Sequence, residues 1–401
     1  MIPPSGISNE FRIVAACCRW PRGPARNAAV REAARSAIDW PRVERVARRH
    51  RVFALVHNGL VEAGVALPEA AAQRLAGEAR RVRLTALAMA REAALLQEAF
   101  DAAGCPALFV KGVSLAVLAY GDIGLKHAWD IDLLTTPETT AQGCAILARH
   151  GYRLVEPAAL DGRRLELFME LAKECVLVHP EKRIAVELHW RLVDNPHLLP
   201  GIDARSPTRS VAIGSQQLRT LPDAELLAYL TVHGTRSVWM RLKWLADVGA
   251  LLVRYDVAEI DALYRRLQTL GTGRAASVAL LLCHQLLGLA LPDALLAELR
   301  ADRRTGRLAA AALAALTYGD GEREFPDYSE AGVRARLARF EIGSGWGYLA
   351  AELGALWRSP IDRLALPLPP RLTFLYHVLR IPLWALRRLG ALRGTARPKP
   401  G

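Results

Sequence analysis

Two aspartates, Asp130 and Asp132, are separated by one apolar residue in the segment WDIDLL. On a β-strand alternate residues point to the same face, so the two carboxylates project together while Ile131 and Leu133 point into a core. Neighbouring carboxylates repel each other unless a cation neutralises them, and Mg²⁺ prefers carboxylate oxygens. The pattern therefore indicates a metal site, and the alternative is a solvated strand face.

A third acidic residue, Glu187, lies between apolar neighbours in the segment AVELHW. If its strand lies beside the DIDLL strand, three carboxylates converge on one face of a sheet. Such a group could hold two metal ions for an in-line displacement at phosphorus. Because Asp132 would be one of two mutually repelling acids, we expect Asp132→Ala to abolish turnover and leave the fold intact.

A glycine turn precedes the aspartate pair in the segment FVKGVS, which we expect to run from a strand into a helix. The free N–H groups of a helix N-terminus can cradle a phosphate, and glycine lets the backbone approach it closely. Lys111, Gly112 and Ser114 are therefore candidate phosphate-binding residues. Strand–glycine–helix junctions are also common without a ligand.

The elements around these residues predict an α+β fold, with a small mixed β-sheet core flanked by N-terminal and C-terminal helical domains. Apolar residues recur with helical spacing from 27 to about 103, and Asp223 begins a long helical segment that reaches Tyr255. Between them we expect five strands, at 106–111, 130–135, 151–156, 173–179 and 183–190. The expected domains are a helical domain (1–104), the catalytic core (105–215), a second helical domain (216–318), and a linker with a basic helical tail (319–401).

Four sequence blocks occur in a characteristic order: the helix IDWPRVERVARRHRV, then VKGVSLAVLAYGDIGLKHAWDIDLL, VELHWRL and HGTRSVWMRLKWLADVGALL. On these blocks the sequence resembles the DNA polymerase β-like nucleotidyltransferase superfamily. It is most similar to the bacterial group of uncharacterised nucleotidyltransferases, over roughly residues 36–255.

The resemblance implies transfer of a nucleotidyl group from an NTP such as ATP, with release of pyrophosphate and two Mg²⁺ ions as cofactors. Asp130 and Asp132 would ligate both ions, and Glu187 would ligate the ion that activates the acceptor hydroxyl and could serve as its base. Gly112 and Ser114 would hold the triphosphate. The acceptor is open: a small molecule, a peptide or protein, or an RNA.

The sequence departs from the superfamily pattern in its glycine turn. Val113 splits the usual Gly-Ser pair, the gap from Gly112 to Asp130 is longer than the common form, and Lys126 stands where relatives more often have arginine. Five of the chain's few lysines fall between 111 and 243, and Lys111, Lys126 and Lys243 lie inside the shared blocks. A compact ammonium suits a phosphate, so these three are candidate NTP ligands.

Several neighbouring residues have both a functional and a structural interpretation. His189 should share the face of Glu187 and could orient an acceptor or make a structural hydrogen bond. Trp129 and Trp190 could stack on a base, although tryptophans beside strands more often pack. Arg241, which we place on one helix with Lys243, could contact nucleotide.

The formal net charge of +13 is concentrated at the chain ends. Residues 1–51 carry 11 basic and four acidic residues, and residues 371–401 carry seven basic and no acidic residues. The basic C-terminal helix could contact an anionic membrane surface or an acidic partner, or pack on the N-terminal helices. The alternative functions are accordingly a catalytically degenerate nucleotide-binding or interaction protein that uses its basic termini, and an RNA-binding protein.

Six cysteines without CxxC spacing argue against a thiolate metal site and a disulfide framework. The first residues lack a secretory signal pattern, and no apolar run is long enough for a membrane span. We therefore expect a cytoplasmic protein.

Overall fold

The computed structural model describes residues 6–157, 162–326, 329–357, 362–363, 366, 368 and 370–388. The N-terminal helices are α1 (Asn9–Cys17), α2 (Pro24–Ala33), α3 (Trp40–His50), α4 (Phe53–Glu62) and α5 (Glu69–Ala102). The central region contains β1 (Leu108–Phe109), α6 (Val113–Tyr120), β2 (Asp130–Leu134), α7 (Thr140–Arg149), β3 (Arg153–Glu156), α8 (Gly162–Leu171), β4 (Glu174–His179), β5 (Ile184–His189), β6 (Arg209–Ile213) and β7 (Gln216–Thr220). The C-terminal helices are α9 (Asp223–Arg236), α10 (Leu242–Leu252), α11 (Val257–Thr269), α12 (Gly273–Leu282), α13 (Asp293–Ala301), α14 (Arg303–Thr317), α15 (Glu330–Ile342), α16 (Trp346–Trp357) and α18 (Tyr376–Arg388).

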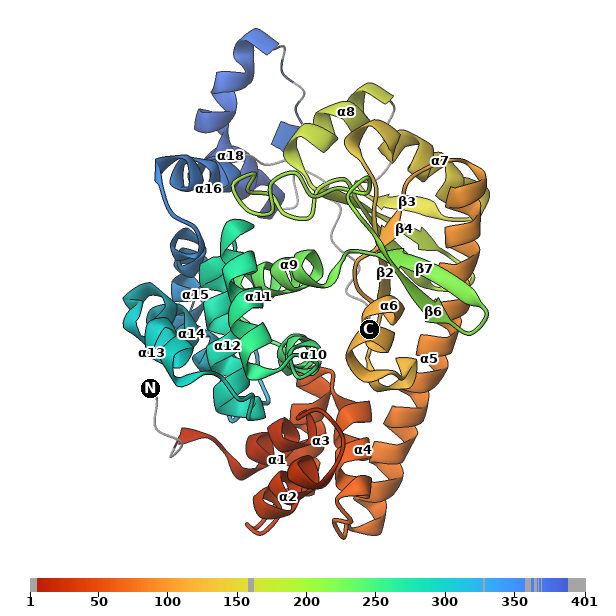
Figure 1. Ribbon diagram of the computed structural model, residues 1–401. Helices are drawn as coiled ribbons and strands as arrows, with labels where there is room; N and C mark the ends of the chain where they lie inside the picture. Colours follow the sequence, from red (N-terminus) through yellow and green to blue (C-terminus); the bar gives the residue numbers. More distant parts are fainter. Residues whose placement is uncertain are drawn as a thin grey trace.

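The N-terminal helices begin and end at residues whose chemistry favours those positions. Helix α3 follows Asp39, whose carboxylate accepts a hydrogen bond from the Arg42 backbone N–H at 3.1 Å, and has Pro41 in its first turn. Helix α5 starts directly after Pro68 and runs for 34 residues along one side of the molecule (Figure 1). This long helix connects the N-terminal helices with the sheet.

All five strands expected from the sequence are present, and they form one mixed sheet in the order β1-β2-β5-β4-β3. Strands β2 and β5 are parallel, whereas the other neighbours pair antiparallel. The mixed sheet between two sets of helices confirms the α+β class. A separate hairpin, β6–β7, was not expected, and its turn lies at the boundary placed between residues 215 and 216.

The two faces of the five-stranded sheet have different neighbours. Ile131 and Leu133 of β2, with Val186 and Leu188 of β5, join a hydrophobic cluster that includes residues of α5 and α7. Burial of these apolar residues holds the sheet against the two helices. The alternate residues of β2 and β5 therefore point to the opposite face, toward α9 and α10.

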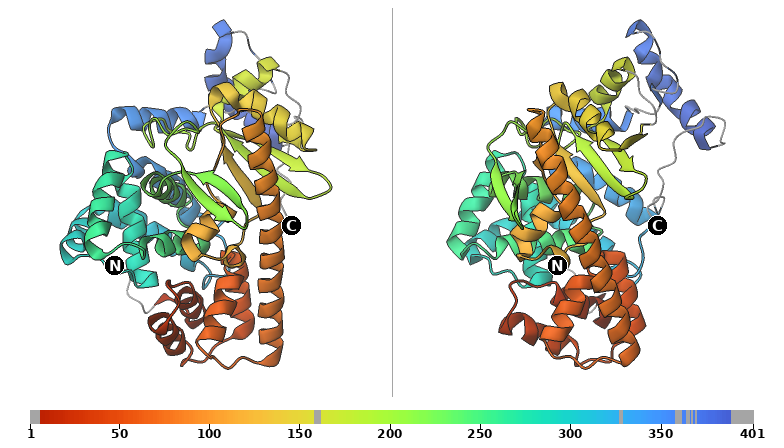
Figure 2. Two further views of the ribbon diagram at one scale, coloured as in Figure 1. Left: turned by 45° about the vertical axis from the view of Figure 1, so that its right-hand side comes forward. Right: turned by 90° about the vertical axis from the view of Figure 1, so that its right-hand side faces the viewer.

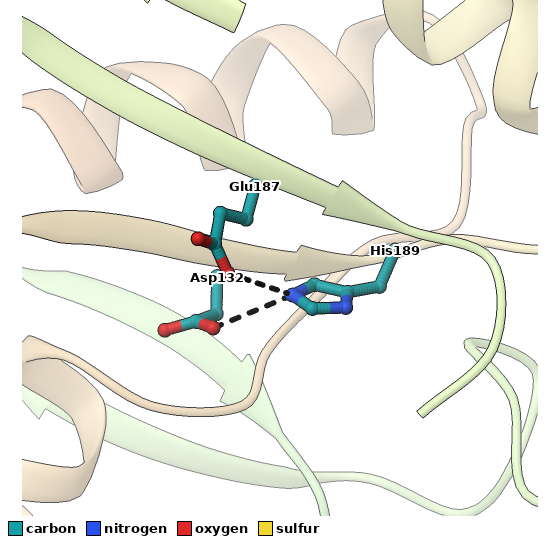
Figure 3. Close-up of side chains that lie close together, drawn as sticks. All are labelled: Asp132, Glu187 and His189. Atoms are coloured by element: carbon teal, nitrogen blue, oxygen red, sulfur yellow. Dashed lines mark hydrogen bonds and ion pairs between the residues drawn. The ribbon is translucent and has the colours of Figure 1, made fainter. Parts of the chain in front are cut away.

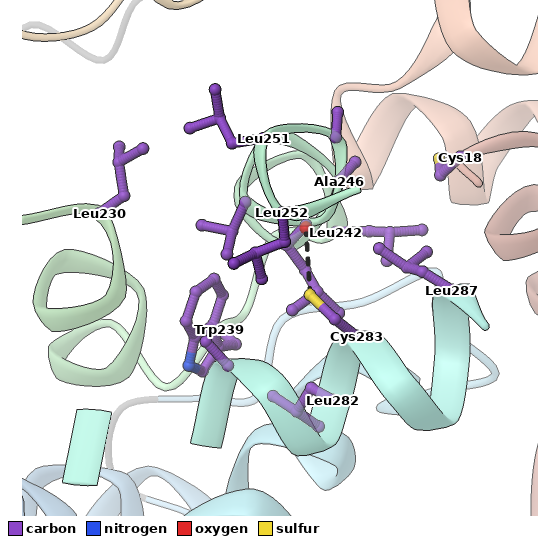
Figure 4. Close-up of a cluster of buried hydrophobic side chains, with 14 of the residues drawn as sticks. Cys18, Leu230, Trp239, Leu242, Ala246, Leu251, Leu252, Leu282, Cys283 and Leu287 are labelled. Atoms are coloured by element: carbon purple, nitrogen blue, oxygen red, sulfur yellow. Dashed lines mark hydrogen bonds between the residues drawn. The ribbon is translucent and has the colours of Figure 1, made fainter. Parts of the chain in front are cut away.

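The helices on either side of the sheet in sequence share a second hydrophobic cluster, which extends from α1 to α16. Figure 4 shows the part of this cluster where Trp239 and Leu242 approach Cys283. Trp239 is fully buried and donates a hydrogen bond to the Thr235 hydroxyl at 3.1 Å. One continuous core thus joins the N-terminal and C-terminal helical segments.

The prediction of a single helix from Asp223 to Tyr255 is wrong. Helix α9 ends at Arg236 and α10 begins at Leu242. Between them Val238 and Trp239 adopt positive φ angles of 51° and 48°, which are incompatible with a continuing right-handed helix. Burial of the Trp239 side chain below this turn outweighs the helical periodicity of the sequence.

The C-terminal helix α18 lies far from the N-terminal helices, at the opposite end of the molecule (Figure 1), so the alternative in which it packs on them is wrong. It projects from the body together with the 3₁₀ turn Pro370–Leu375, as the two further views also show (Figure 2). Phe374, Val378 and Ile381 of this segment are 61%, 72% and 68% exposed. Among the described residues, no helix combines the length and hydrophobicity needed to cross a membrane.

Candidate active site

The parallel pairing of β2 and β5 brings the carboxylates together. Asp132 is directly opposite Glu187 in the register, and Asp130 is opposite Ala185. Because paired residues of adjacent strands point to the same face, Asp130, Asp132 and Glu187 share the face that α9 and α10 cover. The sequence analysis predicted that the carboxylates converge only if these two strands are neighbours, and the register confirms that they are.

His189, two residues after Glu187, completes a compact group with Asp132 and Glu187 (Figure 3). Its Nε2 atom lies 3.3 Å from Asp132 Oδ1 and 3.7 Å from Glu187 Oε2, and its Nδ1 atom lies 2.9 Å from Glu174 Oε2. One ligand atom from each of Asp132, Glu187 and His189 falls within 4.8 Å of the others. The donor atoms could therefore contact a single metal ion.

Asp132 is the most enclosed of these acids, and Lys111 balances its charge. The side chain is 3% exposed, and Lys111 Nζ donates to Oδ1 at 2.9 Å. Burial opposes its ionisation, but Lys111 and the hydrogen bond from His189 outweigh burial and hold the pKa of Asp132 well below its usual range. Burial similarly opposes the charge of Lys111, yet Asp132 raises the pKa of Lys111 well above normal. The two groups form a buried ion pair.

The other two carboxylates carry negative charge that the protein neutralises less completely. Burial, followed by the charges of Asp132, Glu174 and Asp130, raises the pKa of Glu187 to about 7. Burial and the neighbouring Asp132 also raise the pKa of Asp130. A cation bound on this face would relieve the repulsion among these groups.

This network corrects the expectation that Asp132→Ala would leave the fold intact. That expectation considered only repulsion between Asp130 and Asp132. In the structure, loss of Asp132 would leave the Lys111 ammonium buried without its ion pair, which costs several kcal/mol. The substitution therefore affects stability as well as chemistry.

The glycine turn before α6 has the backbone geometry that its sequence requires. Gly112 has φ 67° and ψ −130°, a combination that is open essentially to glycine alone. Ser114 is fully buried, and its hydroxyl donates toward the backbone carbonyls of Phe109 at 2.9 Å and Lys111 at 3.0 Å. The structure thus uses Ser114 to fix the turn and does not bring its hydroxyl to the cavity described next.

A cavity of about 30 Å³ lies between the sheet and helices α9 and α10. The sequence-predicted residues that line it are Lys111, Gly112, Lys126, Asp130, Asp132 and Lys243. Additional lining residues include His127, His233, Trp244 and Asp247. This volume accommodates one or two water molecules, so a nucleotide cannot enter the cavity unless its lining side chains move.

The two lysines from outside the glycine turn, Lys126 and Lys243, differ in how their charges are paired. Lys126 is buried and forms an ion pair with Asp247, whose other carboxylate oxygen accepts a hydrogen bond from the Tyr120 hydroxyl at 3.0 Å. Lys243 has no ion pair among the residues that the structure describes. Burial, Lys126 and Arg51 lower the pKa of Lys243 to about 7.

The structure shows different surroundings for Trp129 and Trp190, for which the sequence left stacking on a base and packing as alternatives. Trp190 is 2% exposed, and its Nε1–H donates to the backbone carbonyls of Met169 and Ala172 at 3.1 and 2.9 Å, so it packs. Trp129 is 37% exposed and stacks on His127 with a centroid distance of 4.6 Å. Arg241 is not on the helix expected for it: it precedes α10 and pairs with Glu324.

Sequence reasoning missed Glu174, Arg51 and Tyr229 as parts of the site. Glu174 contacts His189 because β4 pairs with β5, and Lys111 Nζ lies 5.1 Å from the centre of the Tyr229 ring. The alternation within KECVLVH could have placed Glu174 on the face of Glu187 once the hairpin was expected. No local signal connects Arg51 or Tyr229 with the carboxylates, because both come from distant helical segments.

Comparison with protein families gives one match that covers more than half of the chain. The family described as uncharacterised nucleotidyltransferase matches residues 36–288, a region that contains the sheet, the carboxylates and helices α3 to α12. The matched region extends beyond the end expected near residue 255. No curated protein and no solved structure matches the chain.

Proposed function

The chain belongs to the uncharacterised nucleotidyltransferase family, and on that premise we propose that it transfers a nucleotidyl group from an NTP to an acceptor hydroxyl and releases pyrophosphate. The observation that carries this proposal is the register of β2 and β5, which sets Asp132 opposite Glu187 with Asp130 on the same face. Acidic side chains from adjacent strands are the ligands expected for phosphoryl-transfer metals.

The donor set fits a divalent cation. Asp132, Glu187 and His189 offer ligand atoms within 4.8 Å of one another, and Asp130 adds a carboxylate from the same strand as Asp132. Asp130, Asp132 and Glu187 would hold Mg²⁺, while Glu174 would keep His189 oriented. A divalent cation bound there supplies positive charge to the phosphate oxygens and lowers the pKa of an acceptor hydroxyl.

The protein's own residues would prepare the acceptor and the phosphates. Glu187, with its pKa raised to about 7, is suited to accept the proton of an acceptor hydroxyl near neutral pH. Lys111 would exchange part of its contact with Asp132 for a phosphate oxygen when substrate binds. Lys126 and Lys243, on the other wall of the cavity, would add positive charge, and Gly112 would allow close approach of the backbone.

The test combines binding with turnover. Thermal unfolding is followed with each NTP, with and without Mg²⁺, and pyrophosphate release is measured with candidate acceptors; ligand that binds only the native state raises the unfolding midpoint. Asp130→Asn and Glu187→Gln should remove the Mg²⁺-dependent shift, because both keep the side-chain shape and lose the charge. Glu181→Gln, an exposed acid in the turn after β4, is the matched control and should behave as wild type.

Two results would count against the proposal. A Mg²⁺-dependent shift of equal size in wild type and in both variants would refute the assignment of the site. NTP binding that depends on these carboxylates, without turnover on small-molecule, peptide or RNA acceptors, would favour the alternative function of a degenerate nucleotide-binding protein.

A separate observation favours an anionic membrane as a contact partner. Phe374, Val378 and Ile381 follow one another at helical spacing and are largely exposed, in a stretch where residues 371–401 carry seven basic and no acidic residues. An apolar stripe with a basic fringe suits the interface of an anionic bilayer. Co-sedimentation with vesicles containing phosphatidylserine should fall for Phe374→Ser/Ile381→Ser, and equal binding by this double variant would refute the contact.

A further inference from the structure

Three cationic or imidazole side chains line one wall of the cavity, beside the carboxylates, and a fourth, Arg51, lies close to them. Lys126, His127 and Lys243 line the cavity, and the charge of Arg51 acts on His127, Lys243 and Asp130. They come from three separate segments: the end of α3, the loop before β2, and the first turn of α10. The tertiary structure alone brings them together.

The protein balances their charges only in part. Lys126 is paired with Asp247, but among the described residues Arg51 and Lys243 form neither an ion pair nor a hydrogen bond through their side chains. The Nδ1 atom of His127 is buried and has no hydrogen-bond partner in the same part of the chain. Buried polar groups are usually satisfied, so the unpartnered Nδ1 atom of His127 requires an explanation, and the unpaired cations of Arg51 and Lys243 lie beside it.

These groups lower the pKa values of one another. Burial, Lys243 and Arg51 lower the pKa of His127 to about 3, and burial followed by Arg241 lowers the pKa of Arg51. These groups raise the free energy of one another's charged forms, an effect that the carboxylates of Asp130, Asp247 and Glu324 offset only in part. An anion at this wall would remove the repulsion.

Arg51 is held in place by backbone and ring contacts. It ends α3 in the left-handed conformation, with φ 57° and ψ 44°, which non-glycine residues rarely adopt. Its guanidinium lies 5.5 Å from the centre of the Trp129 ring, whose neighbour in the stack is His127. Strained backbone at a site is a reason to look for function there. Here it directs a cation toward Asp130.

We propose that Arg51, His127 and Lys243 form an anion subsite that binds the polyphosphate of the nucleotide, beside the carboxylates and in place of the serine of the glycine turn. This proposal rests on the proposed function for the identity of the ligand. The Ser114 hydroxyl is already engaged by two carbonyls. Within the described part of the chain, by contrast, the Arg51 and Lys243 side chains have no ion pair or hydrogen bond, and His127 Nδ1 has no hydrogen-bond partner. Arg51 thereby makes the N-terminal helical segment part of the substrate site.

The test measures binding of inorganic tripolyphosphate without metal, and of ATP with Mg²⁺, by isothermal titration calorimetry on the full chain. The informative variant is Arg51→Gly, because glycine tolerates the left-handed conformation and removes only the cation. Arg51→Asn, which also tolerates this conformation, is the second variant, and Lys243→Met tests the other wall. Arg48→Ala is the matched control, since Arg48 lies on the same helix and pairs with Glu78 on the surface.

Arg51→Gly and Lys243→Met should each weaken tripolyphosphate and ATP binding at least about tenfold, because each removes a charge-assisted contact. Arg48→Ala should bind both as wild type does, and Arg51→Gly should unfold no earlier than wild type. Unchanged tripolyphosphate affinity in a folded Arg51→Gly or Arg51→Asn protein would overturn the anion subsite.

The outcome also separates this inference from the proposed function. If Mg²⁺-dependent turnover requires Glu187 but ATP affinity is the same in Arg51→Gly and wild type, the subsite fails and the transferase stands. If tripolyphosphate binding requires Arg51 and Lys243 but no NTP yields pyrophosphate with any acceptor, the subsite stands and the transferase fails.

Discussion

Replacing Asp132 by alanine should destabilise the protein, because the Asp132–Lys111 ion pair is buried. Lys111 Nζ lies 2.9 Å from Asp132 Oδ1, and their side chains are 16% and 3% exposed. After the substitution, the Lys111 ammonium would remain below the surface without its carboxylate partner, and His189 would keep only its contacts with Glu174 and Glu187. An unpaired buried charge is the main source of the effect.

The expected magnitude follows from two opposing contributions. Removing one partner of a buried ion pair costs about 3–5 kcal/mol. Relief of the repulsion that Asp132 exerts on Asp130 and Glu187 returns roughly 1 kcal/mol, which leaves a net loss of about 2–4 kcal/mol. If the 401 residues unfold as one unit with an entropy of about 2.1 cal/mol/K per residue, this corresponds to a midpoint lowered by roughly 2–5 °C.

The assay is a double-mutant cycle followed by thermal unfolding in the presence of EDTA, so that no metal replaces the missing contacts. The variants are Asp132→Ala, Lys111→Met and the combination of both, because replacing both partners of a buried pair is close to neutral. Asp261→Ala, which breaks an exposed pair with Arg265, is the control and should shift the midpoint little.

A midpoint for Asp132→Ala equal to that of wild type would refute this reasoning. Additive effects of the two single substitutions would do so as well, because they would show that Lys111 and Asp132 do not stabilise each other.

Three further predictions follow from burial and protonation. Because the pKa of Glu187 is raised to about 7, the folded state keeps a proton that the unfolded state loses above about pH 4.5. The contribution of Glu187 to the free energy of unfolding is therefore fully present below about pH 4.5 and is lost as the pH rises through 7. The unfolding midpoint of Glu187→Gln should lack this fall, and a pH profile identical to that of wild type would contradict the prediction. The pH dependence expected from Lys243 has the opposite sign. Because its pKa is lowered to about 7, the unfolded state binds one more proton than the folded state between about pH 7 and 10.4. Wild type should therefore gain stability over this range relative to Lys243→Met. Trp239→Ala should lower stability by about 3–5 kcal/mol through a cavity in the shared core, measured by thermal unfolding, with Mg²⁺ binding retained in the folded protein.

The strands and the helix entering the site could be derived from the sequence because local rules govern them. Strict alternation in DIDLL and RIAVELHW fixes which side chains share a face, and the glycine turn fixes where α6 begins. The long helix expected across residues 223–255 failed because periodicity does not register the turn that Val238 and Trp239 make in order to bury the indole. Tertiary packing overrode a local preference at that point.

The candidate site also combines features that the sequence predicts with features that depend on tertiary packing. Asp130, Asp132 and Glu187 were identified from residue type and spacing, and the register of β2 with β5 brought them together. His189 was noted on the same strand, but its contacts with Asp132 and Glu174 depend on the pairing of three strands. The triphosphate role inferred for Ser114 came from a motif, whereas its hydroxyl bonds depend on the conformation of the turn.

The sequence by itself determined the acidic face, the α+β class and the family to which the chain belongs, since these depend on residue type, period and order along the chain. Only the tertiary structure decided the electrostatic state of the site. Lys111 neutralises Asp132, Glu187 remains protonatable near pH 7, and Arg51 interacts electrostatically with Asp130 from the end of a helix about eighty residues earlier in the chain. The physical reason is that charge interactions and burial depend on distances through space, which sequence spacing does not specify once the chain folds back on itself.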